Sequence, residues 1–235
     1  MVDGIIGFGQ NDSAVTRKNS NFKGETNKKY RLSFVWWNTD DDGNPDFNHA
    51  SPNMVAKNRI YIKGAGYLIP KGNEFNDLAG TAPRPAIATV VVKWPLDRQG
   101  SVDKTALKNG DYEVLTWIFS KDKYTTLKDQ HTECHFGEFD VMVRCSDANF
   151  QKMTFSPSKG NLYRQLLEKG NGGIGKKIQE EAEALANNIH DAIGRTMTVD
   201  QVKEKLGMET SSPTLAGNDV VGDLDDVLDD ALDDL

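Results

Sequence analysis

The sequence predicts a mainly β protein with C-terminal helices (α+β), and three observations favour this class. Short segments rich in aromatic and β-branched residues recur along the first two thirds of the chain and are typical of strands. Long Gly-, Asn- and Pro-rich connections separate them. After Ser156 the apolar spacing becomes helical. Many short strands with irregular connections indicate an OB-like barrel with long loops and helical additions, rather than alternating strands and helices.

The 235 residues divide into four predicted parts. Residues 1–29 form an irregular basic arm, and residues 30–156 form the OB-like β body. Residues 157–207 form a helical portion, and residues 208–235 form a linker and an acidic tail.

The individual elements follow from local pattern. The expected strands are 30–37, 58–64, 66–70, 86–94, 111–120, 137–145 and 150–155. The expected helices are 123–134, 160–169, 174–193 and 198–206, and Thr198 is placed to cap the last one.

Charge is unevenly distributed along the chain. The net charge is -7, but residues 218–235 contain eight aspartates and no base. The remainder therefore has 28 bases against 35 - 8 = 27 acids and is close to neutral. The two cysteines, Cys134 and Cys145, are too few for a disulfide framework and suit a reducing compartment. With neither a signal-peptide pattern nor an apolar run of ~18 residues, we expect a cytoplasmic protein that does not enter a membrane.

Alternation along the strands predicts a surface for single-stranded nucleic acid. In segment 58–64, Arg59, Tyr61 and Lys63 share the side opposite the two isoleucines. Bases stack on exposed aromatic rings while Lys and Arg neutralise phosphates, so this combination suits a single strand. The same reasoning adds candidates from the other strands: Arg31, Trp37, Lys93, Trp117, Phe119, Lys121, Arg144 and Lys152. Burial of the aromatic members in the core is the alternative.

Enzyme-like motifs are incomplete. The loop 38–49 carries clustered carboxylates, and a metal-dependent nuclease would use Asp40 and Asp42. Segment 170–177 has phosphate-loop spacing, but Lys177 stands where Ser or Thr must bind magnesium. We therefore predict no catalysis and no cofactor. Whether zinc binds remains open, because four residues of suitable type fit no tight spacing: His131, Cys134, His135 and Cys145.

The acidic tail has a regular aliphatic pattern. Its Val and Leu residues recur at three- and four-residue steps, which places them on one face if the segment becomes helical. Alone it should be disordered, whereas on a basic, apolar partner surface it can fold. It can also compete with nucleic acid for the body. The predicted partner-binding residues are Asp223, Leu224, Asp225, Asp226, Leu228, Asp229, Asp230, Leu232, Asp233, Asp234 and Leu235.

The last fifteen residues, VGDLDDVLDDALDDL, resemble the ends of bacteriophage single-stranded DNA-binding proteins of the phage T4 helix-destabilising type. The resemblance implies an OB-fold core that binds DNA, a basic arm for self-association on DNA (counterpart 16–23) and a tail that recruits replication and recombination proteins. It also implies location in the host cytoplasm. That family's zinc site uses three cysteines and a histidine, so two cysteines do not carry it over.

The prediction is therefore sequence-independent binding of single-stranded DNA in phage replication, recombination and repair. A phage structural or protein-interaction protein is one alternative, and a metal-dependent nuclease is the other. The near-neutral body favours the structural alternative, whereas the strand faces and the tail favour DNA binding. Strand order, oligomeric state, site size and the choice between DNA and RNA stay open.

Overall fold

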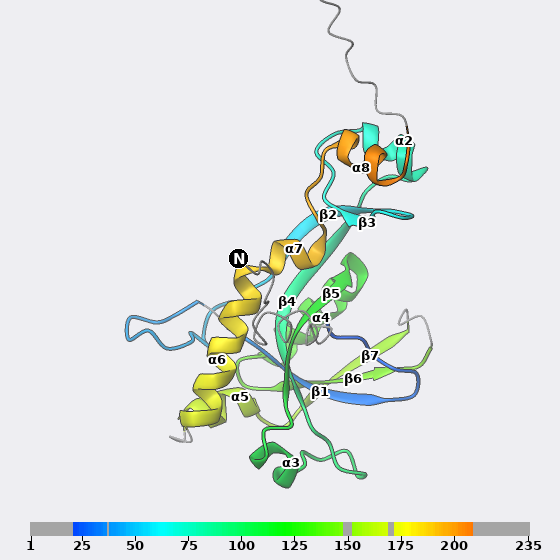
Figure 1. The fold of residues 1–235 in the computed structure, drawn as a ribbon. Coiled ribbons are helices and arrows are strands. Elements are labelled where there is room, and N and C mark those ends of the chain that lie inside the picture. The colour runs from blue at the N-terminus through cyan, green and yellow to red at the C-terminus, as the bar shows by residue number, and fades with distance from the viewer. Residues whose placement is uncertain (1–20, 37, 148–151, 169–171, 209–235) are drawn as a thin grey trace, which may run out of the picture.

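A computed structural model describes residues 21–36, 38–147, 152–168 and 172–208 (Figure 1). Its strands are β1 (Lys29–Phe34), β2 (Val55–Ile62), β3 (Gly66–Leu68), β4 (Arg84–Trp94), β5 (Glu113–Ser120), β6 (Asp140–Cys145) and β7 (Met153–Ser158). Its helices are α2 (Glu74–Ala79), α3 (Lys104–Lys108), α4 (Lys121–Glu133), α5 (Leu162–Glu168), α6 (Gly172–Asn187), α7 (Ile189–Ile193) and α8 (Val199–Lys205). The predicted mainly β class with C-terminal helices is confirmed.

All seven strands belong to one antiparallel sheet with the order β3-β2-β4-β1-β6-β7, and β5 pairs with β4. β4 is the central strand, because β2 and β1 follow each other along one of its edges while β5 occupies the other. The described strand pairings leave the sheet open and do not close it into a barrel.

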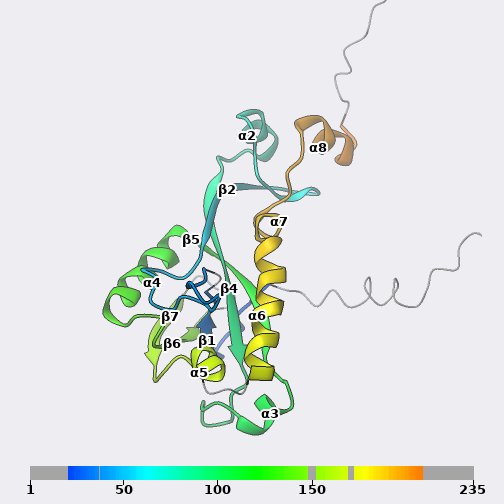
Figure 2. The ribbon, with the colours of Figure 1, turned by 90° about the vertical axis from the view of Figure 1, so that its left-hand side faces the viewer.

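Helices cover both faces of the sheet. α4 packs on β4, β5 and β7, while α6 packs on β4 and β5, and α7 on β2 and β4. Figure 2 shows α4 and α6 on opposite sides of β4. Because both faces are covered, β4 is buried almost continuously from Ala86 to Trp94, and its VVV run has no exposed side.

A small unit stands apart from the main sheet and consists of the end of β2, β3, α2 and α8 (Figure 1). It has its own apolar cluster, in which Val202 of α8 joins Ile60, Leu68 and Phe75. The chain segment before α8 attaches to β3, since Arg195 N–H donates to Tyr67 O and Ile69 N–H donates to Arg195 O, both at 3.0 Å. Thr198 caps α8 as predicted, and it forms a capping box with Gln201. α8 thus packs on β2, β3 and α2 instead of extending the helices before it.

The described end of the N-terminal segment is part of the fold. Phe22 is 6% exposed, and its ring meets Tyr30 and Trp117 edge-on in the main core. Its N–H donates to Thr116 O on the outer edge of β5 at 2.8 Å. Residues 21–29 therefore dock on the sheet, and the rest of the expected arm lies outside the described residues.

Within the described residues, none of the helices combines the length and the apolar character needed to cross a bilayer.

Candidate nucleic-acid interface

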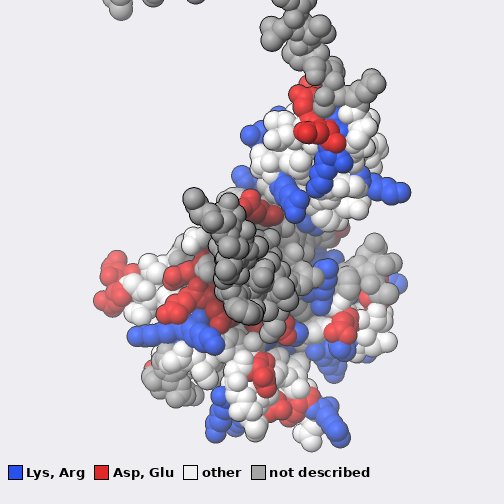
Figure 3. Space-filling view, viewed as in Figure 1, with Lys and Arg blue, Asp and Glu red and all other residues white. Residues whose placement is uncertain are grey.

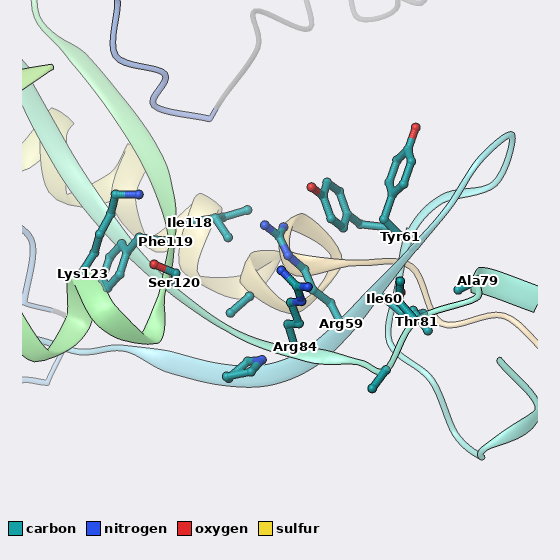
Figure 4. Close-up of a pocket in the computed structure, with 14 residues that line it drawn as sticks. Arg59, Ile60, Tyr61, Ala79, Thr81, Arg84, Ile118, Phe119, Ser120 and Lys123 are labelled. Atoms are coloured by element: carbon teal, nitrogen blue, oxygen red, sulfur yellow. The ribbon is translucent and has the colours of Figure 1, made fainter. Parts of the chain in front are cut away.

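A groove of about 550 Å³ lies where the small unit meets the main sheet (Figure 4). β2 and β3 contribute Arg59, Tyr61 and Tyr67, and the opposite side comes from the start of β4, the end of β5 and the start of α4. Its cations are Arg59, Arg84 and Lys123, and no acidic side chain is found among the described residues that line it. The groove is therefore cationic and suited to an anionic ligand.

Sheet register brings two of these cations together. Arg59 on β2 lies directly opposite Arg84 on β4, and Figure 4 shows the two side chains close to each other. Like charges directly opposite on antiparallel strands destabilise the pair. Neither arginine forms an ion pair with any described acidic residue. An anion bound between them would relieve this repulsion.

The two arginines are not equivalent. Arg59 is half-buried; its guanidinium lies 3.9 Å from the centre of the Tyr67 ring and donates to Ile193 O at 3.3 Å. Burial lowers the pKa of Arg59, but arginine remains protonated throughout the physiological range. Arg84 is exposed at the start of β4 and has no described hydrogen-bond or ion-pair partner. Of the two arginines, Arg84 thus has a side chain without a described partner, while Arg59 contacts the Tyr67 ring.

Two exposed tyrosines stand beside the arginines. Tyr61 and Tyr67 are opposite each other in the β2–β3 hairpin and are 55% and 49% exposed. Their ring centroids are 5.1 Å apart with an interplanar angle of 59°, so they do not stack flat on each other. Adjacent large rings left in solvent are typical of a surface that a ligand covers, and a base can stack on such a ring.

Of the three residues predicted to act together, Arg59, Tyr61 and Lys63, only two line the groove. Arg59 and Tyr61 line the groove, whereas Lys63 is exposed beyond the end of β2 and does not line it. Lys121 is exposed at the start of α4, two residues before the groove residue Lys123.

The expectation that Trp117 and Phe119 face solvent is wrong. They are 2% and 4% exposed and belong to the main core, where Phe22 covers Trp117. Helices pack on both faces of β5, so alternation along this strand separates a buried set, which includes Trp117 and Phe119, from a partly buried set. Phe119 nevertheless lines the groove, whereas Trp117 does not.

Two predicted cations form ion pairs with acidic residues of the protein, Lys93 at the surface and Arg31 with a buried partner. Lys93 pairs with Glu113 across the β4–β5 strands at 2.6 Å. Arg31 pairs at 2.7 Å with Asp140, which is 0% exposed. Asp140 also accepts from the Ser33 hydroxyl and the Leu162 N–H. Arg31 is therefore committed to a buried ion pair, contrary to its predicted role on a DNA-binding surface.

The remaining predicted positions lie elsewhere. Arg144 and Lys152 are exposed near the β6–β7 hairpin and do not line the groove. Trp37 and all the predicted tail residues, from Asp223 to Leu235, lie outside the described residues.

Three cationic or aromatic side chains of the groove were not predicted. Tyr67 could have been found from the strands at 58–64 and 66–70, because a tight hairpin places it opposite Tyr61. Arg84 lies between prolines in a segment assigned to a loop, and Lys123 lies in a helix, so strand alternation gave no signal for either.

Two of the metal candidates, Asp40 and Cys145, have structural roles. Asp40 accepts the backbone N–H groups of Asp42 and Asn44, at 3.1 and 2.8 Å, and so stabilises its own turn. Cys145 is fully buried on the core side of β6. No group of three or more metal-binding side chains occurs in the parts of the chain that the structure describes.

Comparison of the chain with protein-family models, with curated protein sequences and with solved structures gives no match. The fold and the groove define the class only as an antiparallel β protein with a cationic groove beside exposed aromatic rings.

Proposed function

We propose that this protein binds single-stranded DNA without sequence preference in phage replication, recombination and repair, and is not an enzyme. The observation that carries the proposal is the facing pair Arg59 and Arg84 beside the exposed rings of Tyr61 and Tyr67, in a groove without described acidic residues.

Each part of the groove has a role in this proposal. A base stacks on an exposed tyrosine ring for roughly 1–3 kcal/mol, and every base has such a face, which makes the contact independent of sequence. Arg84 meets the adjacent phosphate through charge-assisted hydrogen bonds. Arg59 keeps the Tyr67 ring in place through its cation–π contact.

The wider architecture is consistent with the proposal. One long central strand pairs with three others in an antiparallel sheet, which supports an OB-like relationship in an open form. The eight aspartates of the tail are complementary in charge to the groove. We propose that the tail recruits replication or recombination proteins and competes with DNA, and that the protein self-associates on DNA in the host cytoplasm.

The test is fluorescence anisotropy of labelled oligo-dT at several salt concentrations. The label belongs on the DNA, because Trp36, Trp94 and Trp117 are buried and report poorly on a surface ligand. We expect salt-sensitive binding that Arg84→Gln and Tyr61→Ala each weaken, while exposed Lys71→Gln does not.

Failure of the full chain to bind oligo-dT at low salt would favour the structural or protein-interaction alternative. Magnesium-dependent cleavage lost in Asp40→Ala would favour the nuclease instead.

A further inference from the structure

A second pair of like charges lies side by side on two neighbouring strands, β1 and β6. Lys29 on β1 lies directly opposite Arg144 on β6, and both are exposed. No described acidic residue forms an ion pair with either. They border a hollow of about 250 Å³ together with Met142, Thr154 and Ser156. As in the groove, sheet pairing holds two cations in a position that repulsion disfavours.

Register places this pair on the same face of the sheet as the groove arginines. Side chains ten residues apart on one strand share a face, so Arg84 and Trp94 do so on β4. Arg31 is opposite Trp94, and Lys29 is two residues from Arg31 on β1. Lys29 and Arg144 therefore lie on the face that bears Arg59 and Arg84.

Helices cover the middle of that face and leave its two ends open. α6 and α7 pack on β4, and the intervening β4 side chains Val90, Val92 and Trp94 are buried. The ten residues from Arg84 to Trp94 correspond to about 30 Å along the strand. Figure 3 shows Lys and Arg side chains at several points between the small unit and the region of β6 and β7. The pair Arg59 and Arg84 and the pair Lys29 and Arg144 therefore lie at two separate exposed sites on the same face of the sheet.

We propose that Lys29 and Arg144 form a second phosphate-binding position for the same single strand, beyond the groove. Thr154, opposite Arg144 on β7, and Ser156 supply hydroxyl donors next to the two cations, which suits phosphate oxygens. This inference rests on the proposed single-strand binding and extends its footprint. The groove alone then holds a short oligonucleotide, while a longer strand reaches both positions.

The experiment is an anisotropy titration with oligo-dT of about 4, 8, 16 and 24 nucleotides, which brackets the ~4–16 nucleotides bound by one OB fold. The full chain is compared with Lys29→Gln/Arg144→Gln, with Arg84→Gln and with Lys104→Gln/Lys108→Gln. The last variant removes the same charge from two exposed lysines of α3, which border neither hollow.

The shortest oligonucleotide should bind Lys29→Gln/Arg144→Gln and the α3 variant equally well. The longest should bind Lys29→Gln/Arg144→Gln roughly tenfold more weakly than the α3 variant at low salt, with a salt slope smaller by about 0.7 because one phosphate is no longer neutralised. Equal binding of the longest oligonucleotide to both variants would overturn the second position, as would an equal loss at every length. If instead no length binds the full chain, the proposed function itself fails.

Discussion

The buried ion pair between Arg31 and Asp140 makes a quantitative prediction about stability and pH. Asp140 is fully buried, and this burial raises the pKa of its carboxyl group to about 6 although Arg31 and Ser33 oppose the shift. The ordinary value is 3.8. The difference of about two pKa units corresponds to roughly 3 kcal/mol, at about 1.4 kcal/mol per unit.

The sign follows from proton binding. Between about pH 3.8 and pH 6 the folded protein holds a proton on Asp140 that the unfolded chain releases. The stabilising contribution of Asp140 to the free energy of unfolding is therefore fully present below about pH 4 and is lost as the pH rises through about 6. The free energy of unfolding of the wild type, minus that of Asp140→Asn, should fall by up to about 3 kcal/mol between pH 4 and 7.

Urea unfolding of both proteins at half-unit pH steps, followed by circular dichroism, measures this difference. Subtracting one pH curve of the free energy of unfolding from the other removes the contributions of titrating groups that both proteins share, including the histidines. A difference that stays constant from pH 4 to 7, or that rises with pH, would refute the assigned burial effect. Such a result would mean that Arg31 and the neighbouring donors fully compensate for the loss of hydration.

The remaining predictions concern the groove, the tail and a histidine. Arg59→Lys keeps the charge but loses the planar contact with Tyr67, so oligo-dT affinity should fall about three- to tenfold with an unchanged salt slope; a reduced slope would contradict this role. Deleting residues 219–235 should tighten oligo-dT binding at low salt, and unchanged affinity would exclude competition by the tail. Burial lowers the pKa of His131, whose Nδ1 accepts the Phe136 N–H. The free energy of unfolding should therefore fall as the pH drops below about 6.5, because the unfolded chain binds this proton more readily. His131→Gln should reduce this fall, as measured by urea unfolding.

Strand positions were predictable because they depend on local pattern. The side of segment 58–64 was assigned correctly for Arg59 and Tyr61, since Ile60 and Ile62 need a core and the opposite side is only partly covered, which leaves Tyr61 exposed and Arg59 half-buried. The same reasoning failed for Trp117 and Phe119, because helices and Phe22 cover both faces of β5. Alternation separates two sides of a strand but does not show which one is covered.

Pairing between distant strands was not predictable in this way. Arg59 and Arg84 meet because β2 and β4 adopt a particular register across an intervening hairpin and helix, and Lys29 meets Arg144 across more than a hundred residues. Register depends on the packing of the whole sheet and on the connections. The local sequence around Lys29 or Arg144 therefore does not indicate which residue will lie opposite it.

Because α8 completes the small unit, this unit folds late during synthesis of the chain. The hairpin that carries both tyrosines is synthesised early, but its apolar side is closed by Val202, near the C-terminal end of the described residues. Contacts so distant in sequence form late, because a long loop must close first. A chain emerging from the ribosome therefore has most of its sheet before α8 is available, and the small unit that borders the groove is closed only after α8 has been synthesised.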